Sequence, residues 1–116
     1  MTTLNRANQL QDRTKQFAIP VINASTRVPK TEAARLLTRQ FLRSGASLAA
    51  NYRAACRSRS TADFASKISI TVEKTDETLF WFELLIESGL VNPRVLEPLM
   101  IECEELRKII EITRDS

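Results

Sequence analysis

Six arginines between residues 35 and 59 are the side chains best suited to bind a ligand. They are Arg35, Arg39, Arg43, Arg53, Arg57 and Arg59, and residues 44–50 between the two groups are Ala, Ser and Gly with one Leu. A guanidinium group is always charged and donates hydrogen bonds in a planar fork that fits phosphate or carboxylate oxygens. The sequence leaves three alternatives open: the arginines bind a nucleic acid, bind another protein chain, or form an ordinary solvated surface.

Residues suited to catalysis are sparse. The chain has no histidine, which removes the commonest general base and transition-metal ligand. It also has no Gly-rich phosphate loop, no Cys-x-x-Cys pair and no Gly-x-Ser-x-Gly turn. The acidic cluster of Glu102, Glu104 and Glu105 is better explained as a solvated helix face than as a magnesium site. We therefore predict a non-enzymatic protein with no metal and no cofactor.

Cysteine usage and hydropathy favour a cytoplasmic protein. Cys56 and Cys103 are far apart in the sequence and fit small hydrophobic side chains on helices, with a disulfide between them as the alternative. No apolar run approaches the ~18 residues that a membrane span requires. Residues 1–16 are polar and do not resemble a signal peptide. We therefore expect a cytoplasmic location and no membrane partner.

The elements that position these residues are predicted to be long helices. Only 2 Gly and 4 Pro occur in 116 residues, so few loops are expected. We expect one domain, residues 1–116. Helix-breaking residues divide it into four segments, with helices near 4–27, 30–57, 62–88 and 93–114. Pro20 lies inside the first range, where we expect it to kink the helix.

Several residues are typical of helix ends. Pro29 fits the first turn of the second helix, and Thr61 fits the N-cap of the third. Gly89 is typical of a C-terminal cap. Asn92 followed by Pro93 is typical of an N-cap and the first helical position of the fourth helix.

Each predicted helix carries an apolar stripe at helical spacing. Examples are Phe17 and Val21 in the first range, Phe41 and Leu48 in the second, and Phe82 in the third. Four such helices with short connections predict an all-α fold, an antiparallel up-down-up-down four-helix bundle.

The second helix would carry most of the arginines on one outer face. At 100° per residue, five of them lie within a sector about 80° wide, opposite Phe41 and Leu48. We call these five residues the arginine stripe: Arg35, Arg39, Arg43, Arg53 and Arg57. The stripe would therefore face away from the core and be available to phosphates or to a neighbouring subunit.

The third helix would carry an unusual outer surface in which large apolar side chains alternate with carboxylates. We call it the acidic–apolar patch: Ile70, Glu73, Glu77, Phe80, Trp81 and Leu84. Ile101 and Ile112 add to the outer apolar surface of the fourth helix. Large exposed apolar patches usually mark a partner. We predict an oligomer interface here, the alternative being that a neighbouring helix covers these residues.

Charge divides the chain into two halves. Residues 1–60 carry 11 Lys/Arg and 2 Asp/Glu, a net charge of +9, whereas residues 61–116 carry 6 and 12, a net charge of −6; the sum is +3. Different but complementary surfaces make head-to-tail contacts, which close into rings when the rotation permits. Part of the arginine stripe would then face a neighbour's carboxylates.

Several segments resemble a known bacterial family. They are Pro29-Lys30-Thr31-Glu32, Arg43-Ser44-Gly45, Ala50-Asn51-Tyr52-Arg53, and Asp76-Glu77-Thr78 followed by Phe80-Trp81-Phe82-Glu83-Leu84. The chain is similar to the bacterial four-helix-bundle proteins that include those encoded within intervening sequences of large-subunit ribosomal RNA genes and the accessory variability proteins of retroelements. The resemblance covers residues 13–110. It implies an up-down four-helix bundle and a ring of five subunits.

Two functional hypotheses follow. The first is a non-enzymatic homo-oligomer, a pentameric ring by resemblance, that acts as an accessory protein with RNA or with a nucleic-acid-processing protein. The second is a structural scaffold for protein interactions with no nucleic-acid role.

Overall fold

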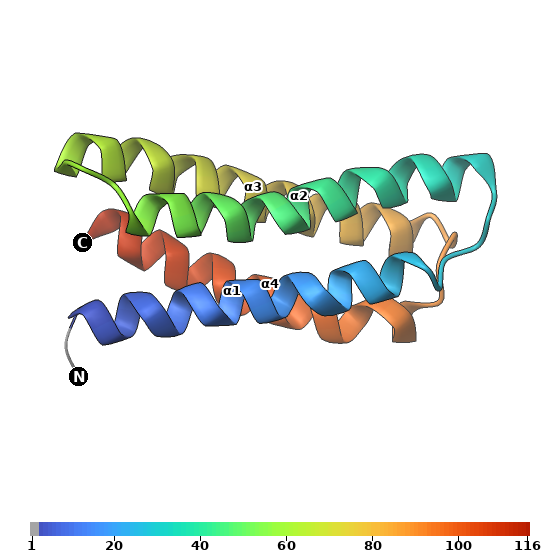
Figure 1. The fold of residues 1–116 in the computed structure, drawn as a ribbon. Helices are drawn as coiled ribbons and strands as arrows, with labels where there is room; N and C mark the ends of the chain where they lie inside the picture. Colours follow the sequence, from blue (N-terminus) through green and yellow to red (C-terminus); the bar gives the residue numbers. More distant parts are fainter. Residues whose placement is uncertain (1–2) are drawn as a thin grey trace.

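The computed structural model describes residues 3–116, with side chains from Arg6 onward. Within these residues the chain forms four α-helices and no strand: α1 (Thr3–Ser25), α2 (Glu32–Cys56), α3 (Thr61–Glu87) and α4 (Pro93–Asp115). The helices alternate in direction and form an elongated bundle of 45 × 24 × 19 Å (Figure 1). α1 begins and α4 ends at the end of the bundle that holds the α2–α3 loop (Figure 1). The predicted all-α, up-down four-helix fold is confirmed.

The four helices lie at the corners of a square, in chain order. α1 packs on α2, α2 on α3, α3 on α4, and α4 on α1, while within the described residues the backbones of the diagonal pairs stay apart and only core side chains bridge them. The α2–α3 contact is the most extensive and the α1–α4 contact is the weakest. Consequently the face formed by α1 and α2 lies opposite the face formed by α3 and α4.

Gly45 allows α1 and α2 to approach closely. A Cβ atom at this position would lie 3.0 Å from Cγ1 of Val21, which is tighter than ordinary van der Waals contact. The contact also shows which side of α2 faces α1, and that direction is used below to place the arginines.

The helix ends correct two sequence predictions. The N-cap of α3 is Ser60, whose hydroxyl accepts a hydrogen bond from the Asp63 N–H, so the prediction of Thr61 was wrong by one residue. α2 is capped by Thr31, so Pro29 lies before the helix instead of in its first turn. The N-cap Asn92 is confirmed, since its side chain accepts from the Arg94 N–H. Gly89 adopts φ +76°, the left-handed conformation that commonly follows a helix end.

The core is centred on three aromatic rings from three helices. The Phe82 ring lies 5.6 Å from Phe41 and 6.5 Å from Phe17, centroid to centroid, and all three residues are buried. The sequence pattern identified these residues but missed the polar part of the α3 inner face. Buried Thr71, Thr75 and Thr78 each donate their hydroxyl to the carbonyl four residues earlier, at 2.7–2.9 Å. Because these hydroxyls are satisfied within their own helix, threonine is compatible with the core.

α1 continues through Pro20 to Ser25. Pro20 and its neighbour Ile19 lie on the exposed side of the helix, so the proline ring faces away from the core.

Candidate functional site

All five residues of the arginine stripe are exposed in the structure. Within the described part of the chain, none of them forms an ion pair or donates a side-chain hydrogen bond. Their guanidinium groups are therefore free to bind anions from outside the subunit.

The stripe divides between the two neighbours of α2. Gly45 faces α1, whereas Gln40, Ser44 and Ser47 line a pocket shared with α3. At 100° per residue, four of the arginines fall on the α1 side of the outer surface; only Arg43 leans toward α3, where it lines that pocket.

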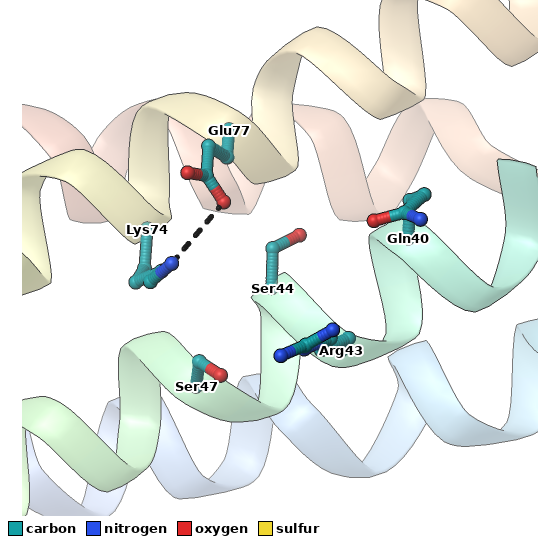
Figure 2. A pocket seen from close by; sticks show the side chains of 6 residues that line it. All are labelled: Gln40, Arg43, Ser44, Ser47, Lys74 and Glu77. Atoms are coloured by element: carbon teal, nitrogen blue, oxygen red, sulfur yellow. Dashed lines mark ion pairs between the residues drawn. The ribbon is translucent and has the colours of Figure 1, made fainter.

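The pocket between α2 and α3 is small and polar. It has a volume of about 200 Å³, and its lining includes Arg43 and Ser47 from α2 and Lys74 and Glu77 from α3 (Figure 2). The Lys74 Nζ atom lies 3.6 Å from Oε2 of Glu77. Glu77, which we assigned to the acidic–apolar patch, is thus paired within its own helix.

The acidic–apolar patch is only partly as expected. Phe80 is 52% exposed, and Ile70, Glu73 and Leu84 are also exposed. Trp81 is half-buried and packs against the core, with its ring 5.0 Å from that of Phe80 in an edge-to-face arrangement. The prediction that Trp81 points away from the core is therefore corrected, and Phe80 is the most exposed apolar member of the patch.

The α3–α4 face extends the patch across two helices. Ile101 of α4 is 65% exposed and lies on the outer side of its helix. Exposed carboxylates without an ion pair in the described chain accompany it: Glu73, Asp76, Glu83, Glu87, Glu97 and Glu105. The acidic half of the sequence therefore forms one acidic and apolar face of the molecule.

The α1–α2 face combines apolar and basic residues. Since Gly45 sits against Val21, the next residues, Ile22 and Ala46, lie at the same level of this face. Ile22 is exposed, and on α2 the arginines Arg39 and Arg53 flank this level. The two opposite faces of the bundle thus carry complementary charge and similar apolar centres.

A groove at the end of the bundle was not indicated by the sequence. It has a volume of about 1110 Å³ and is open to solvent. The first turns of α1, the α2–α3 loop and the end of α4 line it. No local pattern predicts such a groove, because the elements that line it are distant in the sequence.

One ion pair joins α1 to α4 beside this groove. Arg13 donates from Nε and Nη2 to the two carboxylate oxygens of Glu102 at 2.8 and 2.7 Å. These hydrogen bonds hold the pKa of Glu102 below its usual value. Glu102 is therefore a structural partner of Arg13, and the sequence could not pair residues separated by 89 positions.

The two cysteines are free and differ in burial. Cys103 is buried and its thiol lies 3.7 Å from the Thr75 carbonyl oxygen, whereas Cys56 lines the end groove. Burial raises the pKa of both thiols, so each is protonated at neutral pH. Within residues that the structure describes, no group of three His, Cys, Asp or Glu is placed to hold a metal ion, and no helix is long and apolar enough to cross a membrane.

A comparison with known protein families shows to which family this chain belongs. A profile of the 23S rRNA-intervening sequence protein family matches residues 6–111, nearly the whole chain. The chain belongs to this family. A solved structure of a protein with unknown function from the S23 ribosomal protein family of Bacteroides thetaiotaomicron is similar, with a TM-score of 0.86 and 28% identity. The match covers 95% of this chain and 98% of that chain. Among curated proteins no relative was found.

Proposed function

We propose that this family member is a non-enzymatic cytoplasmic accessory protein that acts as a homo-oligomer and binds the phosphates of RNA. The observation that carries the proposal is the arginine stripe, whose five guanidinium groups are exposed and unpaired within the described chain. The family's name refers to intervening sequences of 23S rRNA, an association by gene location, and it is the reason for choosing RNA as the anion to test.

Assembly is proposed to be head-to-tail. The basic α1–α2 face of one subunit would meet the acidic and apolar α3–α4 face of the next, and a ring of five is the closed form that we propose. Phe80, Ile101 and Ile22 would be removed from water, which supplies the driving force. Unpaired carboxylates opposite unpaired arginines would set the orientation of the contact.

We propose that one end of the arginine stripe contacts the neighbouring subunit and that the other end contacts RNA phosphates. Arg35 and Arg39 would contact carboxylates of the neighbouring subunit. Arg53 lies in the last turn of α2 and Arg57 directly follows the helix, close in sequence to Arg59 and at the end of the bundle that also carries Arg6. This concentration of unpaired cations favours phosphate binding there.

A salt titration tests the nucleic-acid role. Each phosphate contact contributes roughly −0.7 to −0.9 to the slope of log K against log salt concentration. The double variant Arg53→Gln/Arg57→Gln should flatten that slope by about 1–2 and weaken RNA binding at low salt. A matched variant, Arg94→Gln/Lys108→Gln, removes two exposed cations from α4 and should leave the slope unchanged. Absence of RNA binding by the wild type at low salt, or equal losses in both variants, would contradict the proposal.

The second candidate is a protein-interaction scaffold without a nucleic-acid role. The exposed apolar residues of the α3–α4 face favour it, since they would promote assembly whatever the arginines bind. A wild-type protein that assembles in solution and does not bind RNA at low salt would support this alternative over the first.

A further inference from the structure

The groove at the end of the bundle has an apolar floor and a polar, basic rim. Its apolar lining includes buried Leu10 of α1 and half-buried Phe64 of α3 and Ile109 of α4, and Ile112 of α4 is 68% exposed. Its volume of about 1110 Å³ slightly exceeds the roughly 300–1,000 Å³ typical of small-molecule sites. The groove is therefore large enough for a flat ring system together with its neighbouring groups.

The charge around the groove is positive. Three arginines line it, Arg6, Arg13 and Arg59, and no Asp or Glu is among the described residues that do so. Arg13 is engaged by Glu102, whereas Arg6 and Arg59 form no ion pair within the described chain. An occupant of this groove should therefore carry negative charge next to an apolar part.

The groove also offers unused hydrogen-bonding groups. Gln9 and Thr61 are exposed and supply an amide and a hydroxyl group to its wall. An aliphatic chain would leave these groups unsatisfied, whereas the edge of a nucleobase carries donors and acceptors that match them.

The groove continues the basic surface of α2. Arg57 directly follows the last helical residue of α2, and Arg59, two residues later, lies on the groove rim. A strand whose phosphates follow the arginine stripe would therefore reach the groove at the end of the helix.

We propose that the end groove receives the unstacked base of a single-stranded RNA whose phosphates lie along the arginine stripe. This proposal rests on the proposed RNA binding and adds that single-stranded segments are preferred. A base inserted against Phe64 and Ile109 would remove apolar surface from water, and Arg59 and Arg6 would contact its flanking phosphates. Duplex RNA keeps its bases stacked and could use the stripe alone.

The first test compares single-stranded and duplex RNA by fluorescence anisotropy. Ile112→Glu places a carboxylate at the groove edge on an exposed side chain, so the bundle should still fold. It should weaken binding of a short oligouridylate by about tenfold, which is within the range of one lost base-stacking contact, and change duplex binding by less than about twofold. Ile19→Glu is the matched control, since it makes the same change at an exposed isoleucine of α1 that lies outside both the groove and the proposed subunit contact. Equal effects of the two variants on oligouridylate, or equal effects of Ile112→Glu on both RNAs, would overturn the proposal.

A second test detects ligand binding in the groove without depending on the arginine stripe. Uridine 5′-monophosphate added to the isotope-labelled wild type should shift the NMR signals of the Phe64 ring and the Ile109 and Ile112 methyl groups. Shifts at these groups support the base site even if longer RNA does not bind, in which case only the proposed function fails. Shifts with decanoate but not with the nucleotide would overturn the inference and assign the groove to an aliphatic anion.

Discussion

α2 and α3 share the most extensive helix contact of the bundle, yet their outer surfaces have opposite chemistry. The outer side of α2 carries five exposed arginines, and the outer side of α3 carries exposed carboxylates together with Phe80 and Leu84. Within the described chain, no ion pair joins α2 to α3. In the proposed head-to-tail assembly, the basic surface of one subunit would meet the acidic and apolar surface of the next.

The inner sides of the same two helices differ as well. α2 presents Phe41 and Leu48 to the core, while a large part of the α3 inner face is threonine. Phe82 is the main aromatic contribution of α3, in contact with rings from both α1 and α2. Stability should therefore depend strongly on Phe82, whereas the outer residues of α3 should contribute little to folding.

The largest expected effect is on the free energy of unfolding, where an inner and an outer residue of α3 should differ. Phe82→Ala should lower the free energy of unfolding by about 3–5 kcal/mol, the usual cost of truncating a fully buried phenylalanine. Phe80→Ala, two residues away and 52% exposed, should cost less than about 1 kcal/mol. Urea unfolding monitored by circular dichroism measures both. Similar losses in the two variants would show that the outer surface of α3 is part of the folding core.

The smallest expected effect concerns the ion pair that links the basic half to the acidic half. Glu102→Gln removes the bidentate partner of Arg13 and should cost about 0.5–1 kcal/mol at pH 7, as for a partly exposed pair. Because the pKa of Glu102 is lowered in the folded state, this contribution is present above its unfolded-state pKa of about 4.3. It is lost as the pH falls through the lower folded-state value.

Unfolding measured at a series of pH values checks this prediction. The difference between wild type and Glu102→Gln should shrink toward zero as the solution becomes strongly acidic. Glu97→Gln, an exposed carboxylate on α4 without an ion pair in the described chain, is the control and should differ little from wild type at any pH. A pH-independent difference for Glu102→Gln would contradict the assigned role of the pair.

The sequence predicted the helices better than the surfaces between them. Apolar periodicity, together with the Pro, Gly and Asn residues that mark helix ends, places every helix end within two residues of its observed position. The error at Ser60 arose because two adjacent hydroxyl residues are equally good N-caps in sequence. Trp81 directly precedes the buried Phe82 and lies about 100° from it around the helix axis. From this position its large ring can turn toward the core.

Features that depend on two distant elements were not predictable. Arg13 and Glu102 meet because α1 and α4 are neighbours, and the sequence contains no local sign of that contact. The end groove likewise is lined by residues of all four helices and of the α2–α3 loop, which only the fold brings together. The arginine stripe was predictable as a face, but its division between α1 and α3 depends on which sides of α2 the neighbours occupy.

Complementary variants provide the most direct test of head-to-tail assembly. Phe80→Glu damages the acidic–apolar patch at a more exposed position than Trp81, and Arg35→Glu/Arg39→Glu damages the basic face. The mass of each protein in solution is measured alone and after mixing in equal amounts. We predict that the wild type is an oligomer, that each variant alone is a monomer, and that the mixture forms a species of two chains through its one intact pair of faces. A monomeric wild type at micromolar concentration, or a mixture that stays monomeric, would contradict the account.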